Sequence, residues 1–101
     1  MGTGDDHQDG QPLSDPSPFA PPVKRSVTIA GHQTAITLEP LFWDALRAAA
    51  ARRGLPVNAL IARIDVARMA APRPPNLASA IRCWIYSDIF QYNDKNRSQQ
   101  G

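Results

Sequence analysis

The feature that most constrains the fold is a change of hydrophobic period at Pro40. Before it, β-branched residues alternate with polar or small ones, a period of two that predicts short strands over 26–30 and 33–38. Gly31 and His32 separate the two runs and indicate a turn or a bulge. A hairpin and one long kinked strand both remain open, with two short strands favoured. After Pro40 the apolar spacing becomes that of a helix, so the pattern predicts a short β ribbon joined to helices.

Three helices are predicted after this change. Proline suits a first helical turn, and the apolar spacing carries the first helix over 41–53, where Gly54 ends it. A second helix opens after Pro56 and reaches about Met69. A proline-rich connector follows, and Asn76 is a natural N-cap for a third helix. The apolar stripe of this third helix comprises Leu77, Ile81, Trp84, Ile85 and Ile89.

The ends of the chain differ in composition from its middle. Residues 1–22 hold five prolines, four Asp and no Lys or Arg, which predicts a disordered acidic tail, since too little apolar area is available to offset the entropy of ordering. The folded domain is expected over 23–92, followed by a polar, disordered tail over 93–101. All eleven basic residues lie after residue 22, against five acidic ones, so the positive charge belongs to the folded part.

Composition excludes several classes of protein. A single cysteine, Cys83, cannot close a disulfide within the chain, which excludes a disulfide-stapled scaffold. No run approaches the roughly 18 apolar residues of a membrane helix, and the N-terminus lacks the features of a secretory signal. A cytoplasmic protein with no membrane contact is therefore expected. No spaced metal ligands and no nucleophile with a base are visible, so we predict no metal, no cofactor and no catalytic residue, and the chain is not expected to be an enzyme.

The run QTAITLEPLFWDALRAAAARRGLPVNALIARID, residues 33–65, resembles the ribbon-helix-helix superfamily of small bacterial DNA-binding proteins. With the lead-in RSVTIAG and the third helix, it is most similar to a less-studied branch with an LExxFWxAL-type core. In that pattern a strand runs into Leu-Glu, Phe-Trp opens the first helix and Gly-Leu separates the helices. The resemblance implies a mainly α fold with a short β ribbon, a ribbon-helix-helix dimer with an added C-terminal helix.

The same elements indicate why two chains would be needed. One strand and two short helices leave the strand unpaired and an apolar helix face uncovered. Two chains solve both problems when their strands pair antiparallel about a two-fold axis. We therefore expect an obligate homodimer with a shared core that contains Ile36, Leu38, Phe42, Leu46, Leu60, Ile61 and Ile64.

The resemblance also implies that DNA bases are read from the ribbon. If Ile36 and Leu38 face the core, then Gln33, Ala35 and Thr37 face outward, where the base readers of this superfamily lie. Gln33 can pair with adenine, Thr37 can bond to several base edges, and Ala35 can touch a thymine methyl. The set departs from the usual pattern, in which a stronger reader would stand at the middle position. An ordinary solvated sheet face is the alternative.

Phosphate contacts are predicted at the start of the second helix. Val57 and Asn58 present free backbone N–H groups at the positive end of the helix dipole. Lys24, Arg25 and Arg53 would add charge there. The alternative for Arg53, as for Arg47 and Arg52, is the solvated face of a helix.

These observations lead to two hypotheses. The first is a homodimeric double-stranded-DNA-binding protein, a transcriptional regulator that inserts a two-stranded β ribbon in the major groove. The alternative is a protein-interaction module, an antitoxin-like or adaptor dimer, whose third helix holds a protein partner. That helix would use Trp84, Ile85, Ile89 and Phe90. The third helix can instead complete the dimer core.

Overall fold

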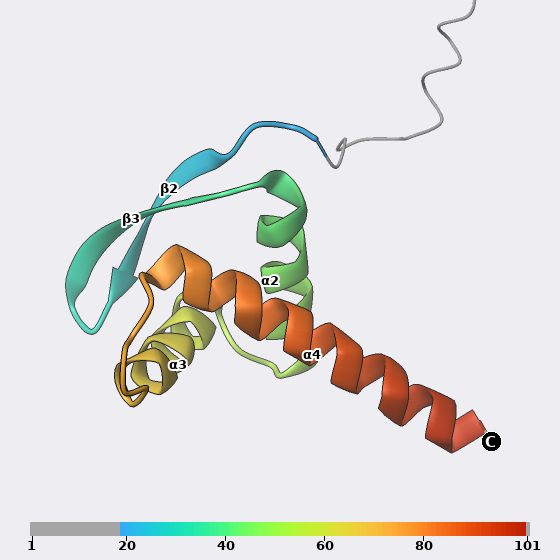
Figure 1. Ribbon diagram of the computed structural model, residues 1–101. Coiled ribbons are helices and arrows are strands. Elements are labelled where there is room, and N and C mark those ends of the chain that lie inside the picture. The colour runs from blue at the N-terminus through green and yellow to red at the C-terminus, as the bar shows by residue number, and fades with distance from the viewer. Residues whose placement is uncertain (1–18, 101) are drawn as a thin grey trace, which may run out of the picture.

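The computed structural model describes residues 19–100, with an antiparallel hairpin followed by three helices (Figure 1). The hairpin consists of β2 (Val23–Ile29) and β3 (His32–Leu38). The helices are α2 (Pro40–Arg52), α3 (Val57–Met69) and α4 (Leu77–Gln100). The fold class predicted from the sequence, mainly α with a short β ribbon and an added C-terminal helix, is confirmed. Most of the predicted acidic tail, residues 1–18, lies outside the described residues.

A tight turn between the strands makes the ribbon a hairpin within one chain. Ala30 and Gly31 both have positive φ, 51° and 84°, as the two central residues of a type I′ turn require. The register runs from Val23 opposite Leu38 to Ile29 opposite His32. The preference for two short strands is confirmed, and β3 takes its partner from its own chain. The turn lies one residue earlier than predicted, on Ala30 and Gly31, because His32 already pairs with Ile29 as the first residue of β3.

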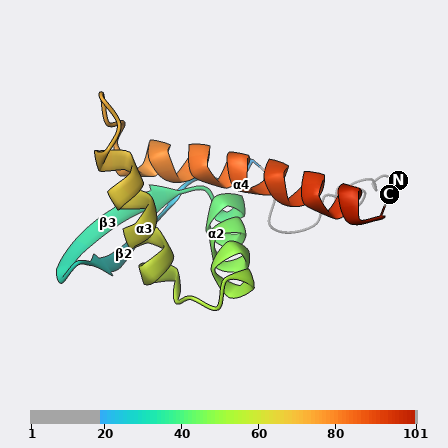
Figure 2. The same cartoon turned by 90° about the horizontal axis from the view of Figure 1, so that it is seen from below.

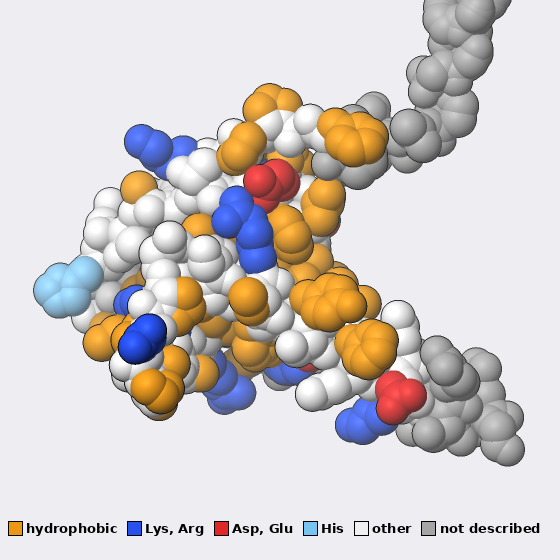
Figure 3. Space-filling model, viewed as in Figure 1, with side chains coloured by type: hydrophobic (Ala, Val, Ile, Leu, Met, Phe, Trp, Pro, Cys, Tyr) orange, Lys and Arg blue, Asp and Glu red, His pale blue; other side chains and the backbone are white. Residues whose placement is uncertain are grey.

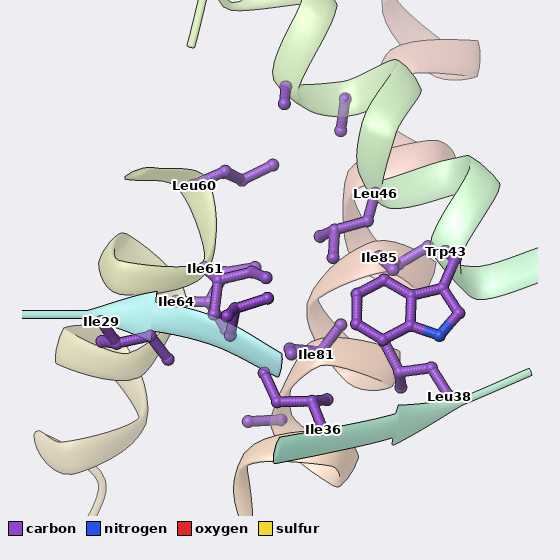
Figure 4. Packing of buried hydrophobic residues seen from close by; sticks show 14 residues of the cluster. Ile29, Ile36, Leu38, Trp43, Leu46, Leu60, Ile61, Ile64, Ile81 and Ile85 are labelled. Carbon is purple, nitrogen blue, oxygen red and sulfur yellow. The ribbon is translucent and has the colours of Figure 1, made fainter. Parts of the chain in front are cut away.

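The core lies between one face of the hairpin and the three helices (Figure 4). Both strands contribute alternate residues to it, and each helix contributes its apolar stripe. Its members are Val27, Ile29, Ile36, Leu38, Trp43, Leu46, Ala49, Ala50, Leu60, Ile61, Ile64, Ala80, Ile81 and Ile85.

The seven residues predicted for a shared dimer core therefore belong to the core of a single chain. Six of them are buried without a partner chain, and Phe42 is half-buried against the same cluster. The inference that one chain leaves a strand unpaired and a helix face uncovered is wrong for two reasons. The neighbouring strand β2 pairs with β3, and α4 covers the apolar side of α2 and α3 with Ile81 and Ile85.

The connection between α2 and α3 is fixed by a glycine. Gly54 has a φ of 65°, a left-handed conformation that suits glycine after a helix end. Its N–H donates to the carbonyl of Ala51, and the N–H of Leu55 donates to that of Ala50, at 3.1 and 2.9 Å. These are the two bonds of a Schellman motif, so the helix end predicted at this glycine is confirmed.

Helix α4 begins as predicted but ends later. The side chain of Asn76 caps it by accepting a hydrogen bond of 2.8 Å from the N–H of Ser79. The predicted tail from residue 93 is corrected, because the helix continues to Gln100. The sequence of its last turns is polar and charged, and the helix continues through them. Figure 2 shows that this half of α4 extends beyond the other elements.

Candidate nucleic-acid interface

The outer face of the hairpin is the side of the two strands turned away from the core. Directly opposed residues of an antiparallel pair point to the same face. Six exposed residues share this face as three opposed pairs: Lys24 with Thr37, Ser26 with Ala35, and Thr28 with Gln33. The structure thus places the three predicted base readers side by side on a solvent-facing surface.

Two members of this outer face were missed by the sequence analysis. Ser26 and Thr28 lie on β2, and both carry hydroxyl groups that can donate and accept hydrogen bonds. Their alternation with Val27 and Ile29 was visible in the sequence. The register between the strands was the missing information, and it is what brings them beside Gln33 and Ala35.

Lys24 and Arg25 lie on opposite faces of β2. Lys24 belongs to the outer face, opposite Thr37, whereas Arg25 lies opposite the buried Ile36. The Arg25 guanidinium is positioned 5.7 Å from the ring centroid of Trp43, which holds it beside α2. Of the two predicted phosphate contacts on this strand, only Lys24 shares a face with the predicted base readers.

The N-terminus of α3 offers backbone donors. The N–H groups of Ala59 and Leu60 donate to the carbonyl of Pro56, so those of Val57 and Asn58 precede the first bonds of the helix. No acidic residue lies in this first turn, and Asn58 is exposed. This end of the helix combines unpaired donors with the positive end of the dipole, as an anion requires.

Arg53 is directed to α4 instead of to this helix start. Its guanidinium bonds to the Asp88 carboxylate at 2.5 Å, donates to the carbonyl of Ala49 at 3.2 Å and lies 5.0 Å from the ring centroid of Trp84. Arg52 bonds to the same carboxylate at 2.8 Å. The structure therefore does not bring Arg53 together with the other predicted phosphate contacts.

The ion pairs show which positive charges are available to a polyanion. Arg47, Arg52, Arg53, Arg68 and Arg82 each pair with a carboxylate. Among residues 19–95, five basic side chains form no ion pair with a described carboxylate: Lys24, Arg25, Arg63, Arg73 and Lys95. The available charge is thus carried mainly by β2, α3 and the connector after α3.

Glu39 joins the end of β3 to α4. Arg82 donates to its Oε1 atom from Nε and Nη2, at 3.0 and 2.9 Å. A hydrogen bond with its own backbone, followed by the one from Arg82, holds the pKa of Glu39 below its ordinary value of 4.5. This carboxylate is consequently ionised at neutral pH, where it fixes the start of α2 against α4.

The third helix divides between buried and exposed residues. Ile85 is buried and Trp84 is half-buried in the core of their own chain, so these two predicted partner contacts are used internally. Ile89 and Phe90 are exposed, as are Tyr86 and Tyr92. Figure 3 shows apolar side chains exposed along this helix.

Other features of the described residues add no second site. A hollow of about 410 Å³ between the end of α2 and the outer half of α4 is lined by the Arg52, Arg53 and Asp88 cluster and by polar neighbours. No group of three His, Cys, Asp or Glu side chains in residues 19–95 is arranged to hold a metal ion. None of the helices in this part of the chain has the length and apolarity to cross a bilayer.

Comparison with protein families supports the architecture. A family model described as a ribbon-helix-helix domain matches residues 22–89, which include both strands, α2, α3 and the half of α4 that covers the core. Neither the curated proteins nor the solved structures returned a match. Since the matched segment is more than half of the chain and its elements are those of the structure, the protein belongs to the ribbon-helix-helix domain family.

Proposed function

We propose that this protein is a homodimeric DNA-binding regulator of transcription that docks the outer face of its hairpin in the major groove. Ribbon-helix-helix domains are in general those of DNA-binding transcription regulators or antitoxins. The observation that carries the proposal is the hairpin itself, a two-stranded ribbon with one exposed, polar face that includes an unpaired lysine. Action on DNA would locate the protein in the cytoplasm.

The width of the ribbon supports the use of one hairpin per groove. Neighbouring strands lie about 4.8 Å apart, so a two-stranded ribbon fits a major groove about 12 Å wide. If two chains joined their β3 edges, the four backbones would span about 14 Å before side chains are added. In this proposal each chain therefore docks its own hairpin in the major groove, and a dimer docks two hairpins.

Contacts with DNA divide into those that read bases and those that hold phosphates. Gln33 can bond to adenine through its amide, and Ser26, Thr28 and Thr37 can bond to other base edges. Lys24 and the α3 N-terminus at Asn58 supply phosphate contacts. Because these base readers carry no charge, affinity would come chiefly from phosphates and would depend strongly on salt.

A salt titration of binding to a mixed-sequence duplex tests the proposal. The full chain is expected to bind at low salt, and Lys24→Gln should lower the slope of log affinity against log salt by about 0.9, the value for one phosphate contact. Lys95→Gln is the matched control, since Lys95 is also unpaired but lies on α4, and its slope should stay that of the wild type. Absence of binding by the full chain at low salt would remove the proposal.

Asn58→Asp separates DNA binding from folding. A carboxylate in the first turn of a helix stabilises it through the dipole, so the melting temperature should stay equal or rise. The same charge repels a phosphate, so affinity for DNA should fall. If the affinity for DNA is unchanged, the N-terminus of α3 does not contact a DNA phosphate, whether or not the hairpin binds DNA.

A second candidate function is an antitoxin-like or adaptor role through α4. The exposed aromatic side chains of Tyr86 and Phe90 favour it, because they lie on a helix of which the inner face is already buried. A stoichiometric protein partner that is lost with Phe90→Ser, from a chain that binds no DNA, would support this function over the first.

A further inference from the structure

Lys24 is an unpaired positive charge on the outer face of the hairpin. Its ammonium group forms no ion pair with a carboxylate of residues 19–95, and it lies on the same face as the hydroxyl groups of Ser26 and Thr37. Arg25, the next residue, is on the inner side of β2, where its guanidinium lies beside the ring of Trp43. An ammonium group with hydroxyl donors around it suits any compact oxyanion, so a carboxylate can bind where a phosphate would.

The chain has its own source of carboxylates for this surface. Five of its nine acidic residues lie within 19–95, and arginines pair with four of these five. The fifth, Asp94, is next in sequence to Lys95 on the outer half of α4. The remaining four precede the hairpin: Asp5, Asp6, Asp9 and Asp15. Residues 1–18, which we call the acidic segment, contain no Lys or Arg and so place a net negative charge directly before a strand with an unpaired lysine.

The acidic segment is long enough to reach the whole outer face. Residues 19–22 lead into the end of β2 that carries Lys24 (Figure 1), so Phe19 lies at most about 14 Å from the first residue of this strand. Asp15 precedes Phe19 by four residues and can span the same distance back, which brings its carboxylate within reach of Lys24. Asp9, ten residues before Phe19, can span about 35 Å and can reach the far end of a face about 20 Å long.

We propose that the acidic segment folds back onto the outer face of the hairpin, where its carboxylates bind Lys24 and compete with DNA phosphates. The contact depends on charge, since Met1 and Leu13 are the only large apolar residues of the segment. Exposed ion pairs are individually weak, so the segment occupies the face for part of the time and DNA can displace it. The identity of the competitor rests on the proposed function, whereas the contact itself forms in the chain without DNA.

Zero-length cross-linking tests this contact in the absence of DNA. A carbodiimide joins a carboxylate to a lysine ammonium group that touches it, and the chain has two lysines, Lys24 and Lys95. Peptide mapping of the monomeric product, which excludes links between copies, should find carboxylates of the acidic segment joined to Lys24. The yield of this product should fall at least about fivefold when the salt is raised to about 0.5 M, because salt screens exposed charges.

Arg25→Lys provides the matched control for closeness along the chain. Position 25 is exposed and is one residue farther from the acidic segment than Lys24, but it lies on the inner side of β2, opposite Ile36. In this variant, which keeps Lys24, the segment should couple to Lys24 in preference to position 25. Equal coupling at the two positions, or coupling that does not respond to salt, would show that the segment meets lysines only through closeness in sequence, and the proposal would be overturned.

Removal of the negative charge tests the competition with DNA. A full-length variant that keeps the length and the prolines of the acidic segment carries four substitutions: Asp5→Asn, Asp6→Asn, Asp9→Asn and Asp15→Asn. All four precede the described fold, so the melting temperature should equal that of the wild type. Affinity for a mixed-sequence duplex should rise about threefold to tenfold at low salt, and the gain should shrink as salt is raised. The same four substitutions should give a smaller gain in Lys24→Gln, since the segment has then lost its cation.

The outcomes separate this proposal from the proposed function. If the wild type binds DNA and the neutral segment leaves its affinity unchanged, the competition is wrong and the proposal is overturned. An equal gain with and without Lys24 would mean that the charge of the segment repels DNA from a distance, which also overturns binding to the hairpin. If no variant binds DNA, the proposed function fails, and the carbodiimide coupling still decides whether the segment lies on the outer face.

Discussion

The outer face of the hairpin and the outer seam of α4, which is the side of the helix that carries Tyr86 and Phe90, are both exposed, but their chemistry is opposite. The hairpin face consists of hydroxyl and amide groups with one lysine, which water solvates well, and its apolar part is limited to small methyl groups. The outer seam places two aromatic rings in water, at a cost that burial would remove. Exposure alone therefore does not reveal a partner. The two surfaces differ in what they can form with a partner: the hairpin face offers hydrogen bonds and one positive charge, whereas the outer side of α4 offers aromatic area.

The largest effect is expected when substitutions on the two faces of α4 are compared for their effect on stability. Ile81 is fully buried, so Ile81→Ala should lower the free energy of unfolding by about 2–5 kcal/mol through lost burial and a cavity. Tyr86→Ala, one helix face away, should change it by less than about 0.5 kcal/mol in dilute solution. Urea denaturation measures both. If the two substitutions lowered the free energy of unfolding equally, Tyr86 would contribute to the stability of the single chain, and the two faces of α4 would not differ as described.

The next effect concerns the hairpin face. Gln33→Ala should reduce discrimination between the preferred base pair and its alternatives by about 1–3 kcal/mol, with little change in nonspecific affinity. Competition binding with duplexes substituted one base pair at a time measures it. Gln91→Ala, an exposed glutamine on α4, is the matched control. If both variants discriminate like the wild type, the hairpin face is a solvated surface and does not read bases.

A smaller effect is expected where α4 is tied to α2. Asp88→Asn removes the carboxylate shared by Arg52 and Arg53, which should destabilise the chain by about 1–2 kcal/mol, because the acidic side chain is largely buried but both arginines are a third exposed. Asp44→Asn removes an exposed pair within one helix and should cost less than about 0.5 kcal/mol. A thermal melt of each variant compares them, and equal losses would mean that Asp88 contributes nothing beyond a surface pair.

The smallest effect is a pH dependence at the junction of hairpin and α4. The pKa of Glu39 is lowered in the folded state, so its contribution to stability is fully present above the unfolded value and is lost as pH falls through the folded pKa. Stability of the wild type should thus fall more than that of Glu39→Gln when the pH is lowered below 4.5. Urea melts across this pH range measure the free energy of unfolding of both chains. If it fell equally in the wild type and in Glu39→Gln, the lowered pKa of Glu39 would be contradicted.

Local features were predictable because their causes lie within a few residues of sequence. The turn after β2, the start and end of α2 and the cap at Asn76 each follow from backbone preferences or a side chain three residues away. The outward direction of Gln33, Ala35 and Thr37 is equally local, since strand side chains alternate. These parts of the candidate site needed no knowledge of the fold.

Nonlocal features were not predictable in the same way. The partner of Arg53 lies 35 residues along the chain, and an arginine at a helix end has the same local pattern whether it meets a carboxylate or a phosphate. The cover of the core within one chain was hidden for a related reason: the sequence shows which residues are apolar but not which strand or helix covers them. Neither the partner of Arg53 nor the cover of the core could be predicted, because the groups involved lie far apart along the chain and not because their interactions are weak.

By itself, the sequence determined the order of strands and helices, the ends of α2, the start of α4 and the chemistry of each face, since hydrophobic period, prolines and glycines act over a single turn or strand. Only the tertiary structure decided that β2 pairs with β3 within one chain, that α4 closes the core and that Asp88 holds two arginines. Those outcomes depend on which of several equally apolar or equally charged groups come close in space, and that choice is made by the packing of the whole chain.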